Sequence, residues 1–308
     1  MKAMFVAVVR GLTDRPGFYV SVNANRGMYA TAFIAGVGRV LGCPVALHHH
    51  SNAYVLDTER RMRFLARCAG PRALHVVVCD VLGEELRCRY PAVERTTALS
   101  NIMAVEEISP GPRRSGGRLR LGHLSNLTRE KGFFLVLRLF EMLLREGIDV
   151  SLVLAGPARQ REVSAALTEA LRVHGDRIDY RGPVYGRAKA QFYSDIDVFL
   201  FPSIYRHETQ GIVNLEALGA GVPVIAYGRA CIPGDLGHGG GLVVRVDEDF
   251  GVRAGELIRE WNKDRSQLAE AKAMARGRFL ELRSASHRQL EILLAQLAGN
   301  DLPPQSNL

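Results

Sequence analysis

One stretch, from Phe199 to Gly228, constrains the fold of this chain more than any other. It begins with an apolar run ending at Phe201, which is typical of a strand buried on both faces of a parallel sheet. A loop follows, then a predicted helix beginning near Gly211, and then the apolar run 222–227 as the next strand. Strand, helix and strand in this order form a βαβ unit and predict an α/β fold. Ligands of such sheets bind at the carboxyl ends of the strands, so we expect a site in the loop after Phe201.

Two glutamates lie in this stretch, Glu208 in the loop and Glu216 inside the helix. The backbone N–H groups of Gly211, Ile212 and Val213 face outward at the helix start, where they suit an anion such as a phosphate, and Gly211 lets it approach closely. Glu216 would repel that phosphate, but its carboxylate accepts hydrogen bonds from two neighbouring sugar hydroxyls. The residues therefore predict a nucleotide-sugar site.

The segment E-T-Q-G-I-V-N-L-E-A-L-G-A-G-V-P-V-I-A, residues 208–226, resembles the E-x(7)-E signature of retaining GT-B glycosyltransferases of family 4. The resemblance implies two Rossmann-like domains and transfer of a hexose-like sugar from a nucleoside diphosphate to an acceptor hydroxyl. It implies that Glu208 contacts a hydroxyl of the transferred sugar. A double displacement with Glu208 as the nucleophile is the other mechanism that the sequence allows. Fixed cations would stabilise the leaving diphosphate, so we expect neither a metal nor another cofactor.

Composition sets the domain count and the compartment. With 308 residues, 47% of them apolar, the chain is long enough for two cores. It contains no run of 18 apolar residues and no signal-peptide pattern, so we expect a cytoplasmic protein. The five cysteines lack C-x-x-C spacing, which argues against a zinc site.

The net charge of +8 is concentrated in the first part of the chain, where residues 1–114 carry 15 Lys and Arg against 9 Asp and Glu. Four of these arginines crowd one predicted helix, at residues 56–69: Arg60, Arg61, Arg63 and Arg67. Such a helix is suited to peripheral contact with anionic lipids at the inner face of the membrane, or to an anionic acceptor. A solvated helix face explains the same pattern equally well. No nucleic-acid motif accompanies the arginines.

The first domain is predicted to be incomplete, because too few residues precede the strand at 17–22 for another βα unit. Residues 2–11 read as the end of an apolar helix. After a helix at 30–41, a short strand at 44–47 leads into three histidines.

These histidines offer three interpretations. Side chains alternate along a strand, so His48 and His50 share one face and His49 points away, which makes a metal site improbable. In the resembling family a histidine of an H-x-H-G pattern contacts the substrate, and this implies a catalytic role for His48 or His50. A histidine that caps the next helix is the remaining interpretation.

The second domain reads as alternating strands and helices. Its strands besides the central unit are expected at 119–123, 150–155, 178–181 and 242–246. Lys131 lies at a predicted helix entry, where it suits a diphosphate. In the resembling family an arginine and a lysine flank the donor diphosphate; Lys131 matches the lysine, and Asn126 stands where the arginine often is. Gly182 to Val184 resembles the loop that pairs with the nucleobase, and 232–236 resembles a loop of the sugar pocket.

The predicted domains are residues 1–114 for the acceptor, 115–285 for the nucleotide-sugar donor, and 286–308 for a last helix and a disordered tail. A Pro- and Gly-rich linker at 109–117 joins the first two. The apolar stripe at 290–297 is expected to pack on the first domain, as the last helix does in GT-B folds.

Three function classes stay open. The first is a glycosyltransferase acting on a glycan or lipid-linked glycan in polysaccharide biosynthesis. The second is a nucleotide-sugar epimerase of the same fold. The third is an inactive donor-binding partner subunit. A NAD enzyme is disfavoured, because no G-x-G-x-x-G follows a predicted strand.

Overall fold

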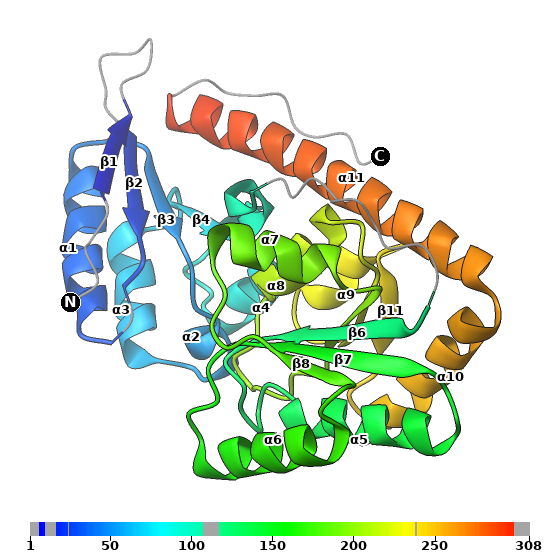
Figure 1. Ribbon diagram of the computed structural model, residues 1–308. Coiled ribbons are helices and arrows are strands. Elements are labelled where there is room, and N and C mark those ends of the chain that lie inside the picture. The colour runs from blue at the N-terminus through cyan, green and yellow to red at the C-terminus, as the bar shows by residue number, and fades with distance from the viewer. Residues whose placement is uncertain (1–5, 10–16, 24, 107–116, 238, 299–308) are drawn as a thin grey trace. The chain divides into compact units, whose positions relative to one another are not determined.

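The computed structural model describes residues 6–9, 17–23, 25–106, 117–237 and 239–298 (Figure 1). The chain divides into two compact units: unit 1 is Met1–Met103 with Arg283–Leu308, and unit 2 is Ala104–Leu282. Each unit has its own sheet with connecting helices, which confirms the predicted α/β class with two Rossmann-like halves. The predicted linker, apart from Gly117, and the predicted tail lie outside the described residues.

Unit 1 is built on a five-stranded sheet whose strands follow the order of the chain. The strands are β1 (Val6–Val9), β2 (Gly17–Ser21), β3 (Val45–His48), β4 (Leu74–Val77) and β5 (Arg95–Ala98). β1 is antiparallel to β2, and the other neighbours are parallel. The helices are α1 (Gly27–Val40), α2 (Ala53–Leu56), α3 (Arg60–Ala69) and α4 (Asp80–Arg89), and a 3-10 turn at Asn101–Ala104 follows β5.

The end of the long helix α11 (Arg265–Leu297) also belongs to unit 1. There Leu293 and Leu297 pack with Ala46, Leu74 and Val76 of the sheet. The predicted packing of the last helix on the first sheet is confirmed, although Leu294 of the predicted stripe is exposed.

Two predictions for unit 1 need correction, and one strand was missed. The apolar run at 2–11 was expected to be helical, but 6–9 form β1, since a valine-rich run next to a free sheet edge favours extended backbone. The arginine-rich helix predicted at 56–69 begins only at Arg60, because Asp57 and Glu59 adopt extended backbone between α2 and α3. β5 was not predicted at all. The prediction that this unit is shortened stays a prediction.

Unit 2 contains a six-stranded parallel sheet in the order β11-β10-β9-β6-β7-β8. The strands are β6 (Leu119–Leu124), β7 (Val150–Ala155), β8 (Ile178–Tyr180), β9 (Val198–Phe201), β10 (Val224–Tyr227) and β11 (Gly241–Val244). Every residue of β9 and of β10 is buried, as expected for strands covered on both faces.

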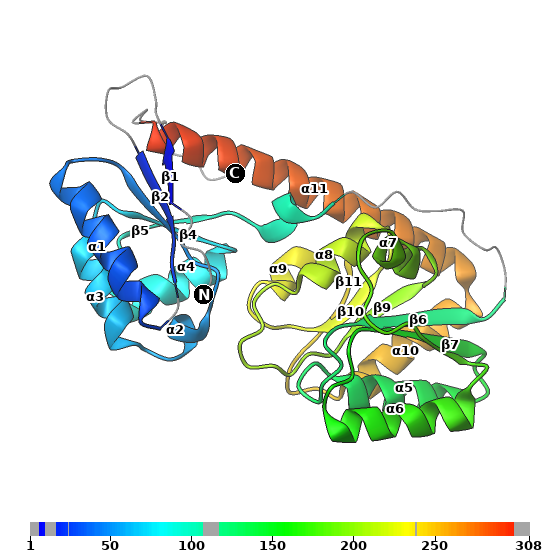
Figure 2. The same cartoon turned by 60° about the vertical axis from the view of Figure 1, so that its left-hand side comes forward.

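Helices cover both faces of this sheet (Figures 1 and 2). One face carries α5 (Phe133–Arg145), α6 (Arg161–His174) and α10 (Phe250–Lys263), and the other carries α7 (Gly186–Ser194) and α8 (Ile212–Gly219). The strand order reverses between β6 and β9, which makes the carboxyl ends of these two strands a topological switch point. We therefore expect a ligand to bind where the loops after β6 and β9 begin.

Two predictions for unit 2 needed correction. Residues 232–236 were expected to be a loop, but they form the short helix α9 (Ile232–Leu236), with a proline in its first turn, where the missing N–H is not needed. The last strand lies at Gly241–Val244 instead of 242–246. Among the described residues, no helix combines the length and the apolar character needed to cross a membrane.

Candidate functional site

The loops after β6 and β9 lie against each other at the switch point. The Ile204 N–H donates to the carbonyl of Glu130 at 2.8 Å. Gly132 has φ +86°, and a Cβ on it would lie 2.2 Å from the carbonyl oxygen of Pro202. A side chain at this position would therefore push the two loops apart, so Gly132 sets the placement of its neighbour Lys131.

Lys131 and Glu208, both predicted site residues, meet between these loops. The Lys131 Nζ lies 2.7 Å from Glu208 Oε2, and the Ser203 hydroxyl donates to the same oxygen at 2.6 Å. The ammonium also lies 4.7 Å from the centre of the Tyr205 ring. Glu208 is only 8% exposed, so its carboxylate is held in one position with its charge balanced. The sequence predicted both residues here but not that they pair.

Glu216, the second glutamate, is held by two side chains of α7. Lys189 Nζ lies 2.5 Å from its Oε1, and the Tyr193 hydroxyl donates to Oε2 at 2.9 Å. Burial raises the pKa of Tyr193 well above its ordinary value, so this phenol stays protonated. Glu216 is 7% exposed, and each oxygen keeps a lone pair for a further donor.

The start of α8 lies between the two glutamates in the chain. Gly211 caps this helix in the left-handed conformation, with φ +65°. Ile212 is exposed, and Gly211 and Val213 are half-buried, so a ligand can reach this end of the helix. The first N–H groups of an α-helix have no partner inside the helix and carry a partial positive charge. This end of the helix is therefore accessible, and anion binding at Gly211, Ile212 and Val213 stays a prediction.

The other predicted donor residues follow neighbouring strands of the same edge. Asn126 is exposed just after β6. Gly182 has φ +63°, and its carbonyl accepts from the N–H of Gly156 at 2.7 Å, which ties together the ends of β7 and β8. Val184 is buried beyond it. One lone pair of the Gly182 carbonyl is thus already used, and the other is available for a ligand.

A cation that the sequence did not predict lies at the same edge. Arg229 follows β10, and its Nε donates to the carbonyl of Ser203 at 3.1 Å. Through Ser203 it joins the group formed by Lys131 and Glu208. Its position two residues past a buried strand, at the edge where ligands bind, was the signal available in the sequence.

A buried histidine, His123, links the two strands that carry these loops. Burial lowers the pKa of His123, in β6, to about 4, so its ring is neutral near pH 7. Its Nδ1–H donates to the carbonyl of Leu200 at 2.8 Å, and its Nε2 accepts from the Ser125 hydroxyl at 2.9 Å. This ring links β6 to β9 directly under the switch point.

The predicted histidines belong to unit 1 and follow β3. The rings of His48 and His50 lie 4.0 Å apart, while His49 points elsewhere and bonds to Tyr54 and His75, each at 2.9 Å. The predicted alternation is confirmed. His48 is buried and bonds to the Tyr19 hydroxyl, and His50 is exposed. Burial, with His50 nearby, lowers the pKa of His48 to about 4.

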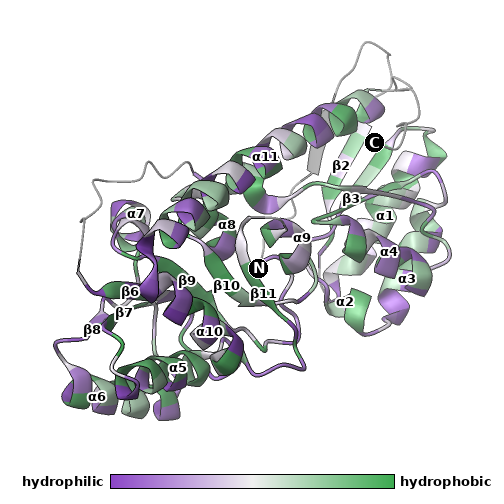
Figure 3. Cartoon of the chain, turned by 90° about the vertical axis from the view of Figure 1, so that its right-hand side faces the viewer, coloured by the Kyte–Doolittle hydropathy of each residue, from purple (hydrophilic) through white to green (hydrophobic). Residues whose placement is uncertain are grey.

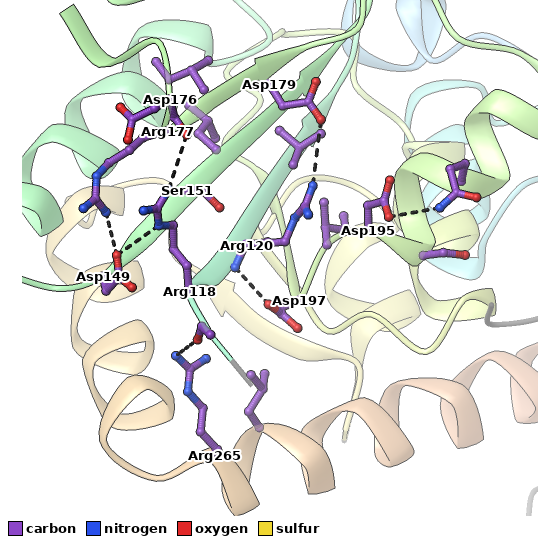
Figure 4. A pocket seen from close by; sticks show the side chains of 18 of the residues that line it. Arg118, Arg120, Asp149, Ser151, Asp176, Arg177, Asp179, Asp195, Asp197 and Arg265 are labelled. Atoms are coloured by element: carbon purple, nitrogen blue, oxygen red, sulfur yellow. Dashed lines mark hydrogen bonds and ion pairs between the residues drawn. The ribbon is translucent and has the colours of Figure 1, made fainter. Parts of the chain in front are cut away.

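A hollow of about 1110 Å³ opens at the opposite edge of the unit 2 sheet (Figure 4). Residues just before four strands line it: Arg118, Asp149, Arg177 and Asp197. Figure 4 shows its arginines and aspartates facing one another, as Arg118 and Arg177 do around Asp149 at 3.0 and 2.6 Å. Its lining carries five cations and five carboxylates. Because these charges cancel and the amino edge of a parallel sheet seldom binds ligands, we place the candidate site at the carboxyl edge.

Comparison with known proteins finds a matching family. The family described as Glycosyl transferases group 1 matches residues 105–276, which include both glutamates and Lys131. Over 113 residues the chain is 33% identical to alpha-monoglucosyldiacylglycerol synthase of Streptococcus pneumoniae, and over 102 residues it is 34% identical to an uncharacterized glycosyltransferase of Methanocaldococcus jannaschii. These segments are 37% and 33% of this chain, and each spans a quarter of the relative's length.

Solved structures extend the likeness to both units. HepE of Anabaena, in complex with UDP, superposes with a TM-score of 0.71 over 89% of this chain and 78% of its own, at 17% identity. TarM of S. aureus superposes with a TM-score of 0.66 over 83% of this chain and 50% of its own, at 18% identity. At these identities the likeness is one of fold, and the fold is that of GT-B glycosyltransferases.

Proposed function

Because the chain belongs to the Glycosyl transferases group 1 family, we propose that it transfers a sugar from a nucleoside diphosphate to an acceptor hydroxyl. One observation carries the proposal: two glutamates, each fixed by a lysine, lie on either side of an accessible helix start at the switch point. An anion at the helix start and hydroxyls at the glutamates match the two halves of a nucleotide sugar.

The diphosphate would be held by the N–H groups of Gly211, Ile212 and Val213 together with Lys131. An ammonium has three N–H donors, so Lys131 can bind a phosphate oxygen while it keeps Glu208. Arg229 would supply the second cation that Asn126 does not. These fixed charges would stabilise the diphosphate as it leaves, which is the largest single effect in many transferases and requires no divalent metal.

The nucleoside would lie beyond Glu216. Lys189 and Tyr193 fix the orientation of this carboxylate, and its free lone pairs would accept from the two ribose hydroxyls. The backbone from Gly182 to Val184 would pair with the base edge. The HepE complexes contain UDP and UDP-glucose, which supports a uridine nucleotide as the first donor to test.

Glu208 would accept a hydrogen bond from a hydroxyl of the transferred sugar and hold the sugar for attack with retention of configuration. His48, neutral near pH 7, or the exposed His50 would contact the substrate from unit 1. A TarM complex contains the glycan fondaparinux, which supports a glycan as the acceptor, while a lipid-linked glycan stays a prediction. A cytoplasmic location and peripheral contact with an anionic membrane stay predictions.

Donor binding and turnover test the proposal separately. Thermal shift with UDP-, GDP- and ADP-sugars should identify the donor, because a ligand at about 100 times its dissociation constant stabilises by about 2.7 kcal/mol. Glu216→Gln should weaken donor binding by about tenfold or more, since it removes a charge-assisted acceptor. Glu208→Gln should retain donor binding and lower turnover by about a hundredfold or more.

Glu169→Gln is the matched control, because Glu169 pairs with Arg172 on an exposed helix face away from the site. Donor binding unaffected by Glu216→Gln would overturn the assignment of the ribose site. Release of an epimerised nucleotide sugar without any acceptor would replace transfer with epimerisation. Donor binding without turnover, with or without acceptors, would identify an inactive donor-binding subunit.

A further inference from the structure

Helix α1 of unit 1 has its bulky and small side chains in the opposite of the usual arrangement. The residues it buries against the unit are mostly small, among them Ala32, Ala35 and Gly38. Apart from the buried Met28, its bulkiest apolar side chains point outward: Tyr29 is 53% exposed, Phe33 73% and Val40 86%. Such a row of exposed apolar groups marks an interaction surface.

These outward residues form one stripe. Tyr29, Phe33, Val37 and Val40 follow one another at spacings of four, four and three residues, which places them on one face of an α-helix. Leu41, directly after the helix, continues the stripe and is also exposed. The stripe therefore runs the full length of α1.

Helix α3 adds arginines and one more aromatic ring. It buries Met62, Leu65, Ala66 and Ala69 on one face. Its opposite face presents Arg60, Arg63, Phe64 and Arg67, all exposed. Phe64 is 49% exposed and lies within one helical turn of each of these arginines.

The two helices pack side by side and make a single surface, which we call the α1–α3 face (Figure 2). The rings of Tyr29 and Phe64 lie 5.8 Å apart and join the two apolar rows. Arg39 of α1 donates to the carbonyl of Arg67 at 2.9 Å, so the positive charges are also continuous across the pair. Figure 3 shows hydrophobic residues of α1 beside hydrophilic residues of α3.

We infer that the α1–α3 face docks on the surface of an anionic lipid bilayer, with the apolar stripe in the headgroup region and the arginines on the lipid phosphates. The two helices carry five arginines, Arg39, Arg60, Arg61, Arg63 and Arg67, and no Asp or Glu. Exposed aromatic and aliphatic groups beside unopposed arginines are the composition of helices that lie in a membrane interface. The inference goes beyond sugar transfer and stands without it.

Charge decides between lipid and a second copy of this chain. A symmetric dimer through the α1–α3 face would bring the arginines of one copy against those of the other, with no carboxylate on either helix to balance them. An anionic bilayer balances every arginine and also accepts the protruding apolar side chains.

Sedimentation of the full chain with vesicles tests the inference. The protein should bind vesicles of phosphatidylcholine with phosphatidylglycerol, bind far less to phosphatidylcholine alone, and be partly released by salt. Phe33→Ser with Phe64→Ser should abolish binding even at low salt. Each of Arg60→Gln, Arg63→Gln and Arg67→Gln should weaken binding by about fivefold.

Matched controls lie on unit 2. Val173→Ser with Val252→Ser removes two apolar groups of similar exposure, and Arg172→Gln removes an equal charge from an exposed helix. Both controls should bind as the wild type does. The inference is overturned if the wild type ignores anionic vesicles, if the phenylalanine variant still binds, or if the controls lose binding equally. A wild-type dimer that Phe33→Ser dissociates would assign the face to a second copy instead.

Discussion

At the scale of single residues, Asp235 differs from the two glutamates of the site. Glu208 and Glu216 each face a lysine, whereas Asp235 in α9 is buried and receives only the side-chain amide of Gln210, at 3.1 Å on Oδ1. Its Oδ2 has no hydrogen-bond partner. Burial raises the pKa of Asp235 to about 7. Gln210 lies two residues past Glu208, so this pair supports the loop that carries the first glutamate.

The raised pKa makes a prediction about stability. The folded protein keeps the proton on Asp235 up to about pH 7, while the unfolded chain releases it near its ordinary pKa, so the stabilisation present in acid is lost as pH rises toward 7. Asp235→Asn removes this titration and keeps a partner for Gln210. The variant should be more stable than the wild type, and its gain should be larger at about pH 8 than at about pH 5 by about 1–3 kcal/mol.

Thermal melting at the two pH values measures this difference. Asp247→Asn, at an exposed aspartate paired with Arg245, is the control and should not show the same gain at high pH. Equal effects of Asp235→Asn at both pH values would contradict a proton held on this carboxyl group.

The residues of the site divide into those that sequence could predict and those it could not. Glu208, Glu216 and the glycine between them were predictable, because one βαβ unit fixes all three within a short segment. Lys189 and Tyr193 belong to the preceding helix, 27 and 23 positions before the carboxylate that they hold. No local spacing connects residues whose contact depends on how two helices pack. For the same reason Lys131 was predicted as a phosphate ligand without its bond to Glu208.

At the scale of elements, the loop between β6 and α5 depends on a glycine. Gly132→Ala introduces both an unfavourable φ and a contact of 2.2 Å with the backbone of Pro202. We expect it to destabilise unit 2 by more than about 3 kcal/mol and to displace Lys131, because a backbone carbonyl cannot move aside as a flexible side chain can. Thermal melting and nucleotide-sugar binding measure the two effects.

Gly147→Ala is the matched control for this change. Gly147 also has a positive φ, +77°, but a Cβ there would meet nothing within 4 Å. The Gly147→Ala variant should therefore lose only the free energy of placing alanine in a left-handed backbone conformation, about 1–2 kcal/mol, and should bind the donor as the wild type does. Equal destabilisation by the two variants would show that the approach of the two loops is not tight.

Buried elements were predicted best, and edge elements worst. The central strands of unit 2 read as continuous apolar runs because both their faces are covered, and β7 was predicted with its observed bounds. β5, the sequence RTTA, carries only one buried residue and has no apolar run to reveal it. At 6–9 a short valine-rich run suits a strand or a helix equally, and only the partner strand decides between them.

At the scale of the whole molecule, the two units differ in the buried groups whose pKa values are shifted. Unit 1 buries His48, His49 and His75, whose pKa values burial lowers, to about 4 for His48 and His75. Unit 2 buries His123, with its pKa lowered to about 4, but also Asp235, with its pKa raised to about 7. The two units should therefore respond differently to acid.

The direction of each response follows from proton binding. A buried histidine stays neutral while the unfolded chain takes up a proton below about pH 6.5, so acid removes about 1.4 kcal/mol per pH unit for each such group until its folded pKa is reached. Asp235 has the opposite effect: as the pH falls below about 7, the folded form takes up a proton before the unfolded chain does, so acid increases the stability of unit 2. Between about pH 6.5 and 4.5, before the paired surface carboxylates of unit 2 begin to take up protons, losses add in unit 1 and largely cancel in unit 2, so unit 1 should unfold at a higher pH.

Two spectroscopic signals separate the units during an acid titration. Trp261 is the single tryptophan of the chain and lies in the core of unit 2, so its fluorescence reports that unit alone, whereas far-ultraviolet circular dichroism reports both. On lowering the pH, part of the dichroism should disappear before the fluorescence changes. His75→Gln removes one of the three titrating groups of unit 1 and should bring the two transitions closer together. Asp235→Asn does not lower the stability of unit 2 in acid, so it should leave the fluorescence transition at or below its wild-type pH. Coincident transitions in the wild type, or a fluorescence change that comes first, would mean that buried histidines do not set the acid limit of unit 1.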